Sequence, residues 1–283
     1  MSLPKSLDKS STVVAPMTNV TSPVKYKVIV VLPAYNEGPN LGLLLSDINH
    51  AVISAGLTYE VVLVDDGSSD QTMEVLQECT RKYPLTVVRH IRNCGLAQTV
   101  RDGLIEASRR AGAADIVVTM DADGTHIPNL VVKMTELIEG GCDVVVASRF
   151  RPGATISGVP LYRQALSVAA SHLCRILFPT EGVRDFTCGY RAFRASVLLD
   201  ASRVYGERLY DAEGFSCTMD LLLKLRRLKI VFAETPIDLR YDLKAGKSKM
   251  RVASTIVATL ALLVRRRLGF WPRPIESARV QNE

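Results

Sequence analysis

The chain has 283 residues, with 35 Lys and Arg against 29 Asp and Glu, and a formal net charge of +6. Its 47% apolar content is enough for a sizeable core and excludes wholesale disorder. The charge is uneven, because residues 221–283 carry 14 basic and 5 acidic residues whereas residues 1–220 carry 21 and 24. This distribution excludes a nucleic-acid binder with a uniformly basic body, so we expect no nucleic-acid partner.

Six cysteines are scattered without a Cys-x-x-Cys pair or a histidine at ligand spacing, which argues against zinc and against a disulfide framework. Residues 1–24 are rich in Ser, Thr and Pro and predict a mobile leader rather than a signal peptide. The most apolar late run, from Val252 to Val264, is shorter than the roughly 20 residues that span a bilayer. We therefore expect a cytoplasmic protein with no transmembrane anchor.

Apolar β-branched runs alternate with amphipathic stretches from residue 25 onward. The first half predicts strands at Lys27–Leu32, Glu60–Val64, Leu85–Arg89, Asp115–Met120 and Asp143–Ala147, and helices at Pro39–Ser54, Gln71–Tyr83 and Ala97–Ala111. The second half predicts helices at Leu161–Phe178, Ser196–Val204, Thr218–Leu228 and Val252–Arg267, and a strand at Ile230–Glu234. Continuous apolar strands separated by helices indicate an α/β fold with a mostly parallel central sheet flanked by helices.

Segments that contain polar residues follow three of the predicted strands. They are Pro33 to Glu37 after the first strand, Asp65 to Ser68 after the second, and Asp121 to His126 after the fourth. Asp and Asn are also common in turns and helix caps, but three caps do not require an Asp-x-Asp pair on one rim. Because ligands bind beyond the carboxyl ends of strands in such sheets, Asp121 and Asp123 predict a site for Mg²⁺ or Mn²⁺ with a diphosphate.

Other nucleotide-binding loops are absent from the sequence. No G-x-G-x-x-G follows the first strand, and no G-x-x-x-x-G-K-[ST] occurs in the chain. Both loops cradle phosphates through glycine backbone at a helix start. A dehydrogenase and a P-loop kinase are therefore excluded.

Six motifs stand in order along the chain: PAYNE, VDDGSSDQT, DADGTHIP, ASRF, DFTCGYRAF and GKSKM. With these motifs, residues 26 to 251 resemble an inverting family 2 glycosyltransferase of GT-A fold, and within it the dolichyl- and polyprenyl-phosphate mannose synthases and glucosyltransferases. The resemblance implies transfer of a hexose, mannose favoured or glucose, from a GDP- or UDP-sugar to a polyprenyl or dolichyl phosphate, with Mg²⁺ or Mn²⁺. Together with the composition, it divides the chain into a leader 1–24, a catalytic domain 25–238 and a basic lid loop, amphipathic helix and tail at 239–283; the leader and the tail lie outside the resemblance.

The resemblance assigns roles residue by residue. The nucleoside would contact Pro33, Tyr35 and Glu37, the base Val64 and Asp66, and the ribose-diphosphate Asp121, Ala122, Asp123 and Arg149. The metal would bind Asp121, Asp123 and Thr125, and the acceptor phosphate Arg163 and Ser167. The family pattern R-x-x-G-x-S-K ends here at Lys249 but has Leu243 in place of its arginine, so either Arg240 or Lys244 would supply that charge. His126 is interpreted as a packing residue, because the family's metal is bound by oxygen.

The acceptor decides which catalytic groups are needed. A lipid monophosphate has a second pKa near 6 and arrives ionised, so it needs cations rather than a base. Candidate cations are Arg149, Arg163, Arg184, Arg191 and Arg194. A hydroxyl acceptor needs a general base, for which Asp220 and Asp185 are the nearest candidates, although Asp185 fits equally well as a turn residue that holds an arginine. The catalytic candidates are therefore Asp123, Arg149, Asp185 and Asp220.

Two alternatives stay open. The first is an enzyme of the same fold acting on a soluble hydroxyl acceptor, such as a natural product or glycan, and the second is a non-catalytic nucleotide-sugar sensor tethered to a membrane protein. Basic residues and Trp271 flank the apolar stretch 252–264, a pattern typical of a helix in the interface of an anionic membrane. A core helix with a solvated basic end fits the pattern equally well. The partners we expect are a nucleotide sugar, a polyprenyl phosphate and the cytoplasmic face of a membrane.

Overall fold

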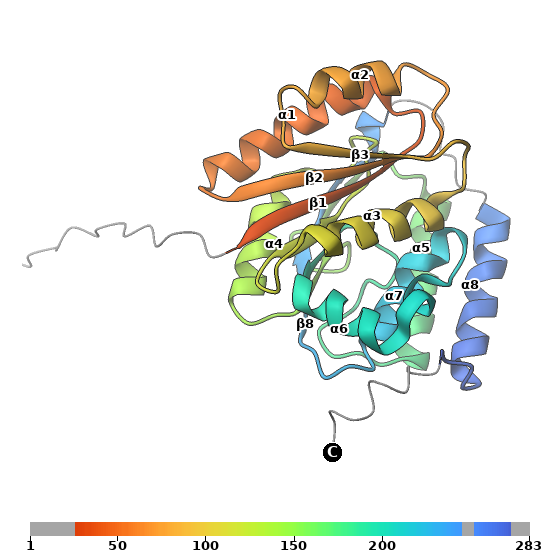
Figure 1. Cartoon of the computed structure of the whole chain (residues 1–283). Helices are drawn as coiled ribbons and strands as arrows, with labels where there is room; N and C mark the ends of the chain where they lie inside the picture. Colours follow the sequence, from red (N-terminus) through yellow and green to blue (C-terminus); the bar gives the residue numbers. More distant parts are fainter. Residues whose placement is uncertain (1–25, 245–251, 273–283) are drawn as a thin grey trace, which may run out of the picture.

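A computed structural model describes residues 26–244 and 252–272 of the chain (Figure 1). Its centre is a seven-stranded sheet in the order β3-β2-β1-β4-β7-β5-β8. The strands are β1 Lys27–Ala34, β2 Thr58–Asp65, β3 Leu85–Arg89, β4 Ile116–Thr119, β5 Val144–Ser148, β7 Arg191–Arg194 and β8 Phe232–Pro236. Their apolar side chains, including all of Val28 to Leu32, are buried because helices cover both faces of the sheet.

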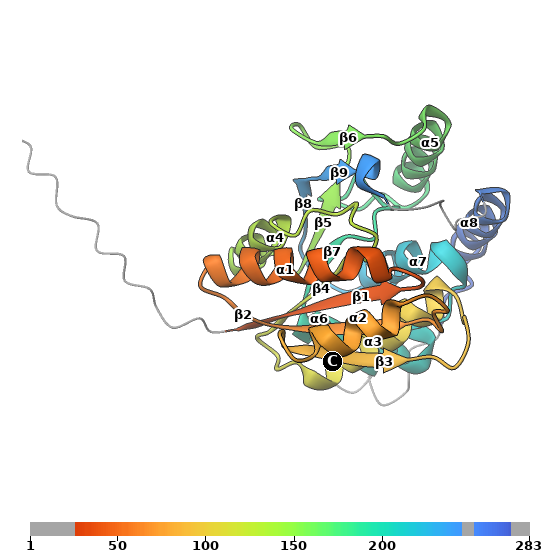
Figure 2. The same cartoon turned by 90° about the horizontal axis from the view of Figure 1, so that it is seen from above.

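Helices form a layer on each face of the sheet (Figure 2). On one face lie α1 Gly38–Ser54 and α4 Leu130–Glu139, with α2 Thr72–Cys79 packed against α1; on the other lie α3 Leu96–Arg110 and α6 Ala195–Tyr205. Close packing of α3 depends on Gly103, where a Cβ atom would lie 2.5 Å from Val31 Cγ1. The architecture is α/β with a mostly parallel central sheet, as the sequence predicts.

The register brings three polar strand ends together. Strands β1, β2 and β4 are parallel, with Ala34 opposite Asp65 and Val31 opposite Thr119. Their carboxyl ends therefore meet at one edge of the sheet. The residues that follow these ends are the motifs at 33–37, 65–68 and 121–126.

Strand β7 departs from the pattern that the sequence indicated. It runs antiparallel between β4 and β5. Its four residues, Arg-Ala-Phe-Arg, are too short and too charged to predict a buried central strand. Helix α4 and the three-residue strand β6, Thr155–Ser157, are also additions to the predicted elements.

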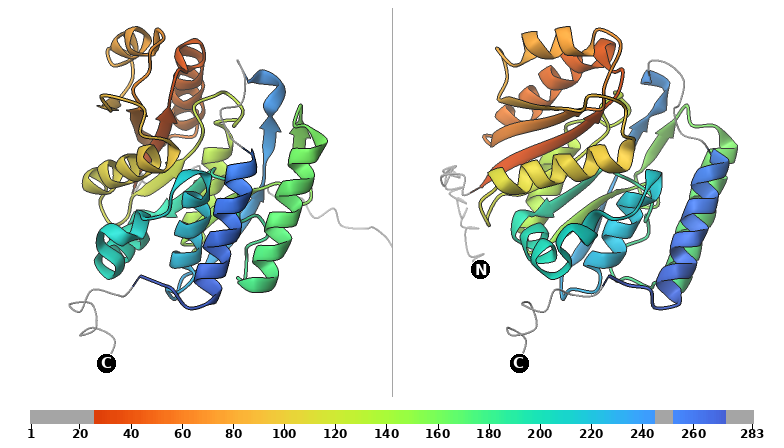
Figure 3. Two further views of the ribbon diagram at one scale, coloured as in Figure 1. Left: turned by 90° about the vertical axis from the view of Figure 1, so that its right-hand side faces the viewer. Right: turned by 45° about the vertical axis from the view of Figure 1, so that its right-hand side comes forward.

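Two long helices stand side by side at one flank of the molecule (Figure 3). They are α5 Leu161–Leu177 and α8 Val252–Arg267, and α7 Cys217–Leu225 lies beneath them. Strand β6 pairs with β9 Asp238–Arg240 in a small second sheet, which lies to the left of α5 in Figure 2. Within the described ranges, no helix combines the length and apolar character needed to cross a membrane. The proposed division at residue 238 stays a prediction.

Candidate functional site

The loop after β1 is tied to the loop after β2. The Asn36 amide donates to Ser68 Oγ at 2.8 Å, and the Ser69 amide donates to Asn36 Oδ1 at 2.8 Å. Asn36 takes a left-handed conformation, with φ of 53°, that asparagine tolerates better than most residues. These hydrogen bonds hold the loop that follows Pro33 and Ala34 at the edge of the sheet. Tyr35 and Glu37 in this loop are both half-buried.

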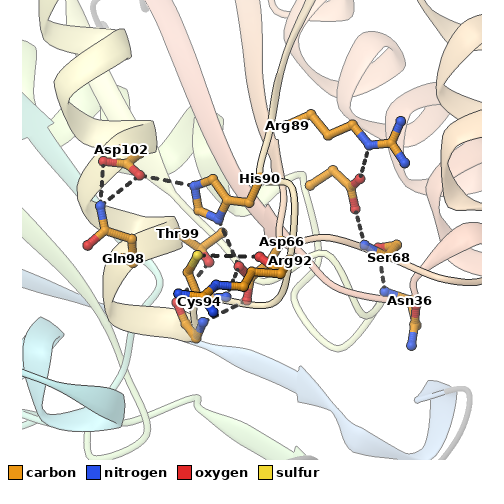
Figure 4. A network of polar contacts seen from close by, with 12 residues as sticks. Asn36, Asp66, Ser68, Arg89, His90, Arg92, Cys94, Gln98, Thr99 and Asp102 are labelled. Carbon is orange, nitrogen blue, oxygen red and sulfur yellow. Dashed lines mark hydrogen bonds and ion pairs between the residues drawn. The ribbon is translucent and has the colours of Figure 1, made fainter.

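Asp66 is buried at the end of β2, inside a network of donors (Figure 4). Its carboxylate accepts the backbone amides of Cys94 and Gly95 at 2.7 and 2.9 Å. His90 lies between Asp66 and Asp102, with its ring nitrogens 2.8 and 3.0 Å from the two carboxylates. The side chain of neighbouring Val64 is fully buried.

The Asp121–His126 loop presents its two aspartates in different settings. Asp121 keeps half of its side chain exposed, whereas Asp123 is buried and accepts from the Thr125 hydroxyl at 2.7 Å. The side chain of Ala122, between them, is buried. His126 stacks on Tyr190 with ring centroids 4.8 Å apart, and its Nδ1 accepts the Asp121 amide at 3.0 Å. His126 therefore shapes this loop as a packing residue.

A lysine from a distant segment lies against Asp123. The Lys244 ammonium pairs with Asp123 Oδ2. Burial opposes both charges, yet their attraction outweighs it, so the pKa of Asp123 lies below its ordinary value and that of Lys244 above. A cation thus sits at the carboxylate of Asp123. Carboxylate and hydroxyl oxygens are donors that Mg²⁺ and Mn²⁺ prefer, so Asp121, Asp123 and Thr125 fit a hard divalent ion.

Arg149 follows β5 and forms a two-pronged ion pair with Asp185. Arg149 Nε and Nη2 donate to the two Asp185 oxygens at 2.8 and 2.7 Å. The backbone amides of Arg149, Thr187 and Cys188 also donate to Asp185. Burial opposes ionisation of Asp185, but Arg149 and these amides hold its pKa below the ordinary range.

Thr187 connects Arg149 to the predicted acceptor-phosphate residues. Arg149 Nη2 donates to the Thr187 hydroxyl, which lies 3.2 Å from Ser167 Oγ on α5. Two residues further on, a Cβ at Gly189 would lie 4.0 Å from Asp121 Oδ1. Segment 187–189 therefore contacts Arg149 and Ser167 at one end and lies close to the aspartate loop at the other.

Tyr241 makes a second connection between α5 and the aspartate loop. Arg163 Nη1 on α5 donates to Tyr241 Oη at 2.8 Å, and the Lys244 ammonium lies 5.5 Å from the Tyr241 ring. Of the two candidate cations near position 243, Lys244 contacts Asp123, whereas Arg240 pairs with Asp242. Lys249 lies outside the described residues.

Asp220 lies in a different cluster, between α7 and α8. Arg266 Nε and Nη2 donate to its two oxygens at 2.7 and 2.9 Å, and Lys224 Nζ is 2.6 Å from Oδ2. All three side chains are almost completely buried. Arg266 thus faces the protein, and the expectation that the basic end of α8 is wholly solvated or lipid-facing is wrong for this residue.

Two of the candidate phosphate-binding arginines bind backbone carbonyls instead. Arg191 donates to the carbonyls of Thr218 and Phe186, and Arg194 to those of Ile138 and Cys142. Arg184 contributes its amide to Glu234 Oε1. Neither Thr187 nor Tyr241 was predicted as a site residue from the sequence, although Thr187 stands inside the motif DFTCGYRAF.

Residues 29–200 match the family model described as glycosyl transferase family 2. Dolichol-phosphate mannosyltransferase of Pyrococcus furiosus is 37% identical over 227 residues, which are 80% of this chain and 59% of that protein. Polyprenol monophosphomannose synthase of Mycolicibacterium smegmatis is 31% identical over 228 residues, 79% of this chain and 81% of the relative.

A solved structure shares the fold at lower identity. Glucosyl-3-phosphoglycerate synthase from Mycobacterium tuberculosis, in complex with Mn²⁺, UDP and glucosyl-3-phosphoglycerate, aligns with a TM-score of 0.60 and 21% identity. The alignment covers 87% of this chain and 81% of that one. The fold is therefore GT-A.

Proposed function

The chain belongs to glycosyltransferase family 2, and we propose that it transfers a mannosyl group from a nucleotide-diphosphate sugar to a polyprenyl phosphate. The names of the mannosyltransferases of P. furiosus and M. smegmatis support this acceptor class. GDP-mannose is the favoured donor, with UDP-glucose as the alternative.

The observation that carries the proposal is the double connection of the acceptor residues to the aspartate loop. Ser167 reaches Arg149 through Thr187, and Arg163 reaches Asp123 through Tyr241 and Lys244. Cations and hydroxyls at this junction suit a phosphate that arrives ionised. The carboxylate beside them, Asp185, already accepts six hydrogen bonds from Arg149, Thr187 and Cys188.

Bond changes in the proposed reaction are simple. An oxygen of the acceptor phosphate attacks the anomeric carbon of the sugar, and the bond from that carbon to the diphosphate breaks with its electron pair leaving on the diphosphate. Arg149 stabilises this developing charge, and Asp185 holds the guanidinium in place. Asp121, Asp123 and Thr125 would hold a divalent cation, which would supply further charge neutralisation. Asp220 serves as an ion-pair partner in this scheme, because Lys224 and Arg266 enclose it.

The nucleotide-sugar donor binds at the edge of the sheet formed by the carboxyl ends of β1 and β2. Tyr35, Glu37 and the backbone after Pro33 border the nucleoside, and Asp66 offers its carboxylate to the base next to Val64. Lys244, which pairs with Asp123, contacts the diphosphate at the aspartate loop, and Lys249, outside the described residues, is a further candidate for that contact. This division keeps the nucleoside at one end of the strand edge and the acceptor phosphate, beside α5, at the other.

Exposed apolar side chains on α5 and α8 support docking at a membrane surface. Leu161 and Ile176 on α5 and Val257, Leu260 and Val264 on α8 are exposed, while Leu262 and Leu263 pack inward. Exposed arginines 265 and 267 lie at the end of α8 and favour an anionic lipid surface. We place the protein at the cytoplasmic face, as a peripheral enzyme.

Radiolabelled GDP-mannose and UDP-glucose, each supplied with Mg²⁺ or Mn²⁺, test the proposal. The acceptor is polyprenyl phosphate in vesicles, and a soluble glycan is offered in a parallel reaction. We expect a lipid-phase product whose formation falls at least about 100-fold in Asp123→Ala, because the charge that holds the diphosphate is lost.

The control is Asp200→Ala, a surface aspartate that pairs with Arg203, which should keep wild-type activity. Label that appears only on the soluble glycan would refute the lipid acceptor. Nucleotide binding without transfer of sugar to either acceptor would favour the non-catalytic nucleotide-sugar sensor.

A further inference from the structure

Asp66, His90 and Cys94 bring an oxygen, a nitrogen and a sulfur donor within 4.8 Å of one another, and we propose that they bind Zn²⁺. Asp66 follows β2, whereas His90 and Cys94 both lie in the loop between β3 and α3, so two loops meet here (Figure 4). Zinc takes this donor set in tetrahedral sites. The sequence argued against zinc because it showed no ligand spacing, and the fold supplies the third ligand from β2.

His90 is oriented for metal binding by a second carboxylate. Its Nε2 is 3.0 Å from Asp102, and Asp102 itself accepts from Gln98 at 2.9 Å. Metal-binding histidines commonly donate one ring N–H to a carboxylate in this way, which turns the other nitrogen toward the ion. Here the other nitrogen, Nδ1, faces Asp66.

Cys94 is fixed in position through its backbone. The amides of Cys94 and Gly95 bind Asp66, and the preceding residues pack tightly on Gly67, where a Cβ would lie 2.5 Å from the Arg92 carbonyl carbon. The Cys94 side chain is exposed and its Sγ contacts the Arg92 carbonyl at 3.3 Å. Tetrahedral zinc ligands lie about 3.3 to 3.8 Å apart. Zinc binding therefore opens the 2.8 Å pair between His90 Nδ1 and Asp66 and brings the Cys94 sulfur closer by about 1 Å, with water as the fourth ligand.

This site differs chemically from the aspartate loop. Imidazole and thiolate favour zinc, whereas the oxygens of Asp121 and Asp123 favour Mg²⁺ or Mn²⁺. Zinc on Asp66 would withdraw a carboxylate from the proposed base-binding position and thereby compete with the nucleotide. Zinc binding itself is independent of sugar transfer, and only this competition rests on the proposed function.

Zinc affinity is measured first without any substrate, by competition with a chromophoric chelator. Wild type and Asp123→Ala should bind one Zn²⁺ with the same affinity, while Cys94→Ser should bind at least about tenfold more weakly. The matched control Cys142→Ser, at a half-buried cysteine elsewhere, should bind as wild type. With Co²⁺ in place of zinc, wild type should show a thiolate charge-transfer absorption that Cys94→Ser lacks.

Unchanged zinc affinity in Cys94→Ser, or a Co²⁺ complex without the thiolate band, would overturn the site. Asp102→Asn tests the orientation of His90 and should weaken zinc binding by about tenfold or more.

A second experiment tests competition between zinc and the nucleotide. In excess Mg²⁺, Zn²⁺ should raise the Kd for GDP and UDP at least about tenfold in wild type but not in Cys94→Ser. Equal effects in both proteins would refute competition at this site.

Discussion

Replacing Asp220 with Asn should loosen the packing of α8 against α7. Asp220 receives both prongs of Arg266 from α8 and the ammonium of Lys224 from its own helix. Asp211 shares the same two cations, at 2.5 Å from Lys224 and 3.4 Å from Arg266. Removing the Asp220 charge leaves two buried cations with one half-exposed carboxylate between them.

The expected loss of folding stability follows from this geometry. The side chains of Asp220 and Lys224 are 1% and 0% exposed, so water cannot replace the lost partner. Breaking such a buried pair costs about 3 to 5 kcal/mol. The lower figure applies here, because Lys224 keeps hydrogen bonds to the carbonyls of Arg208 and Leu209 and both cations keep Asp211. For a domain of this size, about 3 kcal/mol lowers Tm by about 6 to 12 °C.

Thermal melting and steady-state kinetics together test the assignment of Asp220. We expect Asp220→Asn to melt lower while kcat at 25 °C falls less than about tenfold. Adding Lys224→Met should recover part of the loss, because it replaces one of the two buried cations that then share Asp211 with an apolar side chain of similar volume. Asp200→Asn is the control, since an exposed pair contributes at most about 1 kcal/mol. A wild-type Tm with kcat reduced more than about 100-fold would show instead that Asp220 is a general base.

Two further predictions concern Asp185 and the glycines of α1 and α3. Because the pKa of Asp185 lies below its ordinary value of about 4, its ionised form stabilises the fold above that pH, and this contribution is lost as the pH falls through the folded pKa. Asp185→Asn should therefore be less stable than wild type in urea at about pH 7, with a gap that narrows toward about pH 3; a constant gap would contradict this. Gly103→Ala should lose about 1 to 3 kcal/mol in urea unfolding because its Cβ meets Val31, whereas Gly42→Ala, with no atom within 4 Å, should gain about 0.5 to 1 kcal/mol. Equal effects of the two substitutions would refute the packing argument.

Strands β1, β2, β4 and β5 were predictable because each is a continuous apolar run whose neighbours along the chain already mark its ends. Strand β7 was not, since Arg191 and Arg194 sit in it only because carbonyls from distant segments accept their guanidinium groups. The apolar pattern of a short segment indicates whether the segment is buried in a sheet. It does not indicate which groups from distant parts of the chain will accept hydrogen bonds from its polar side chains.

The candidate site divides in the same way. Motifs at the ends of β1, β2 and β4 locate Tyr35, Asp66, Asp121 and Asp123 at one edge, because parallel strands bring their carboxyl ends together. Sequence spacing left open whether Arg240 or Lys244 supplies a charge near position 243, and the path of the chain brings Lys244 to Asp123.

By itself, the sequence determined an α/β sheet, its polar edge and the likeness to family 2 glycosyltransferases. Only the tertiary structure decided which polar side chains lie together. These are Asp220 with Arg266, Asp185 with Arg149, and Asp66 with His90 and Cys94. The physical reason is that strand formation follows from the apolar pattern of adjacent residues. An ion pair or metal site instead depends on distances of a few ångströms between side chains that are tens of residues apart in the chain.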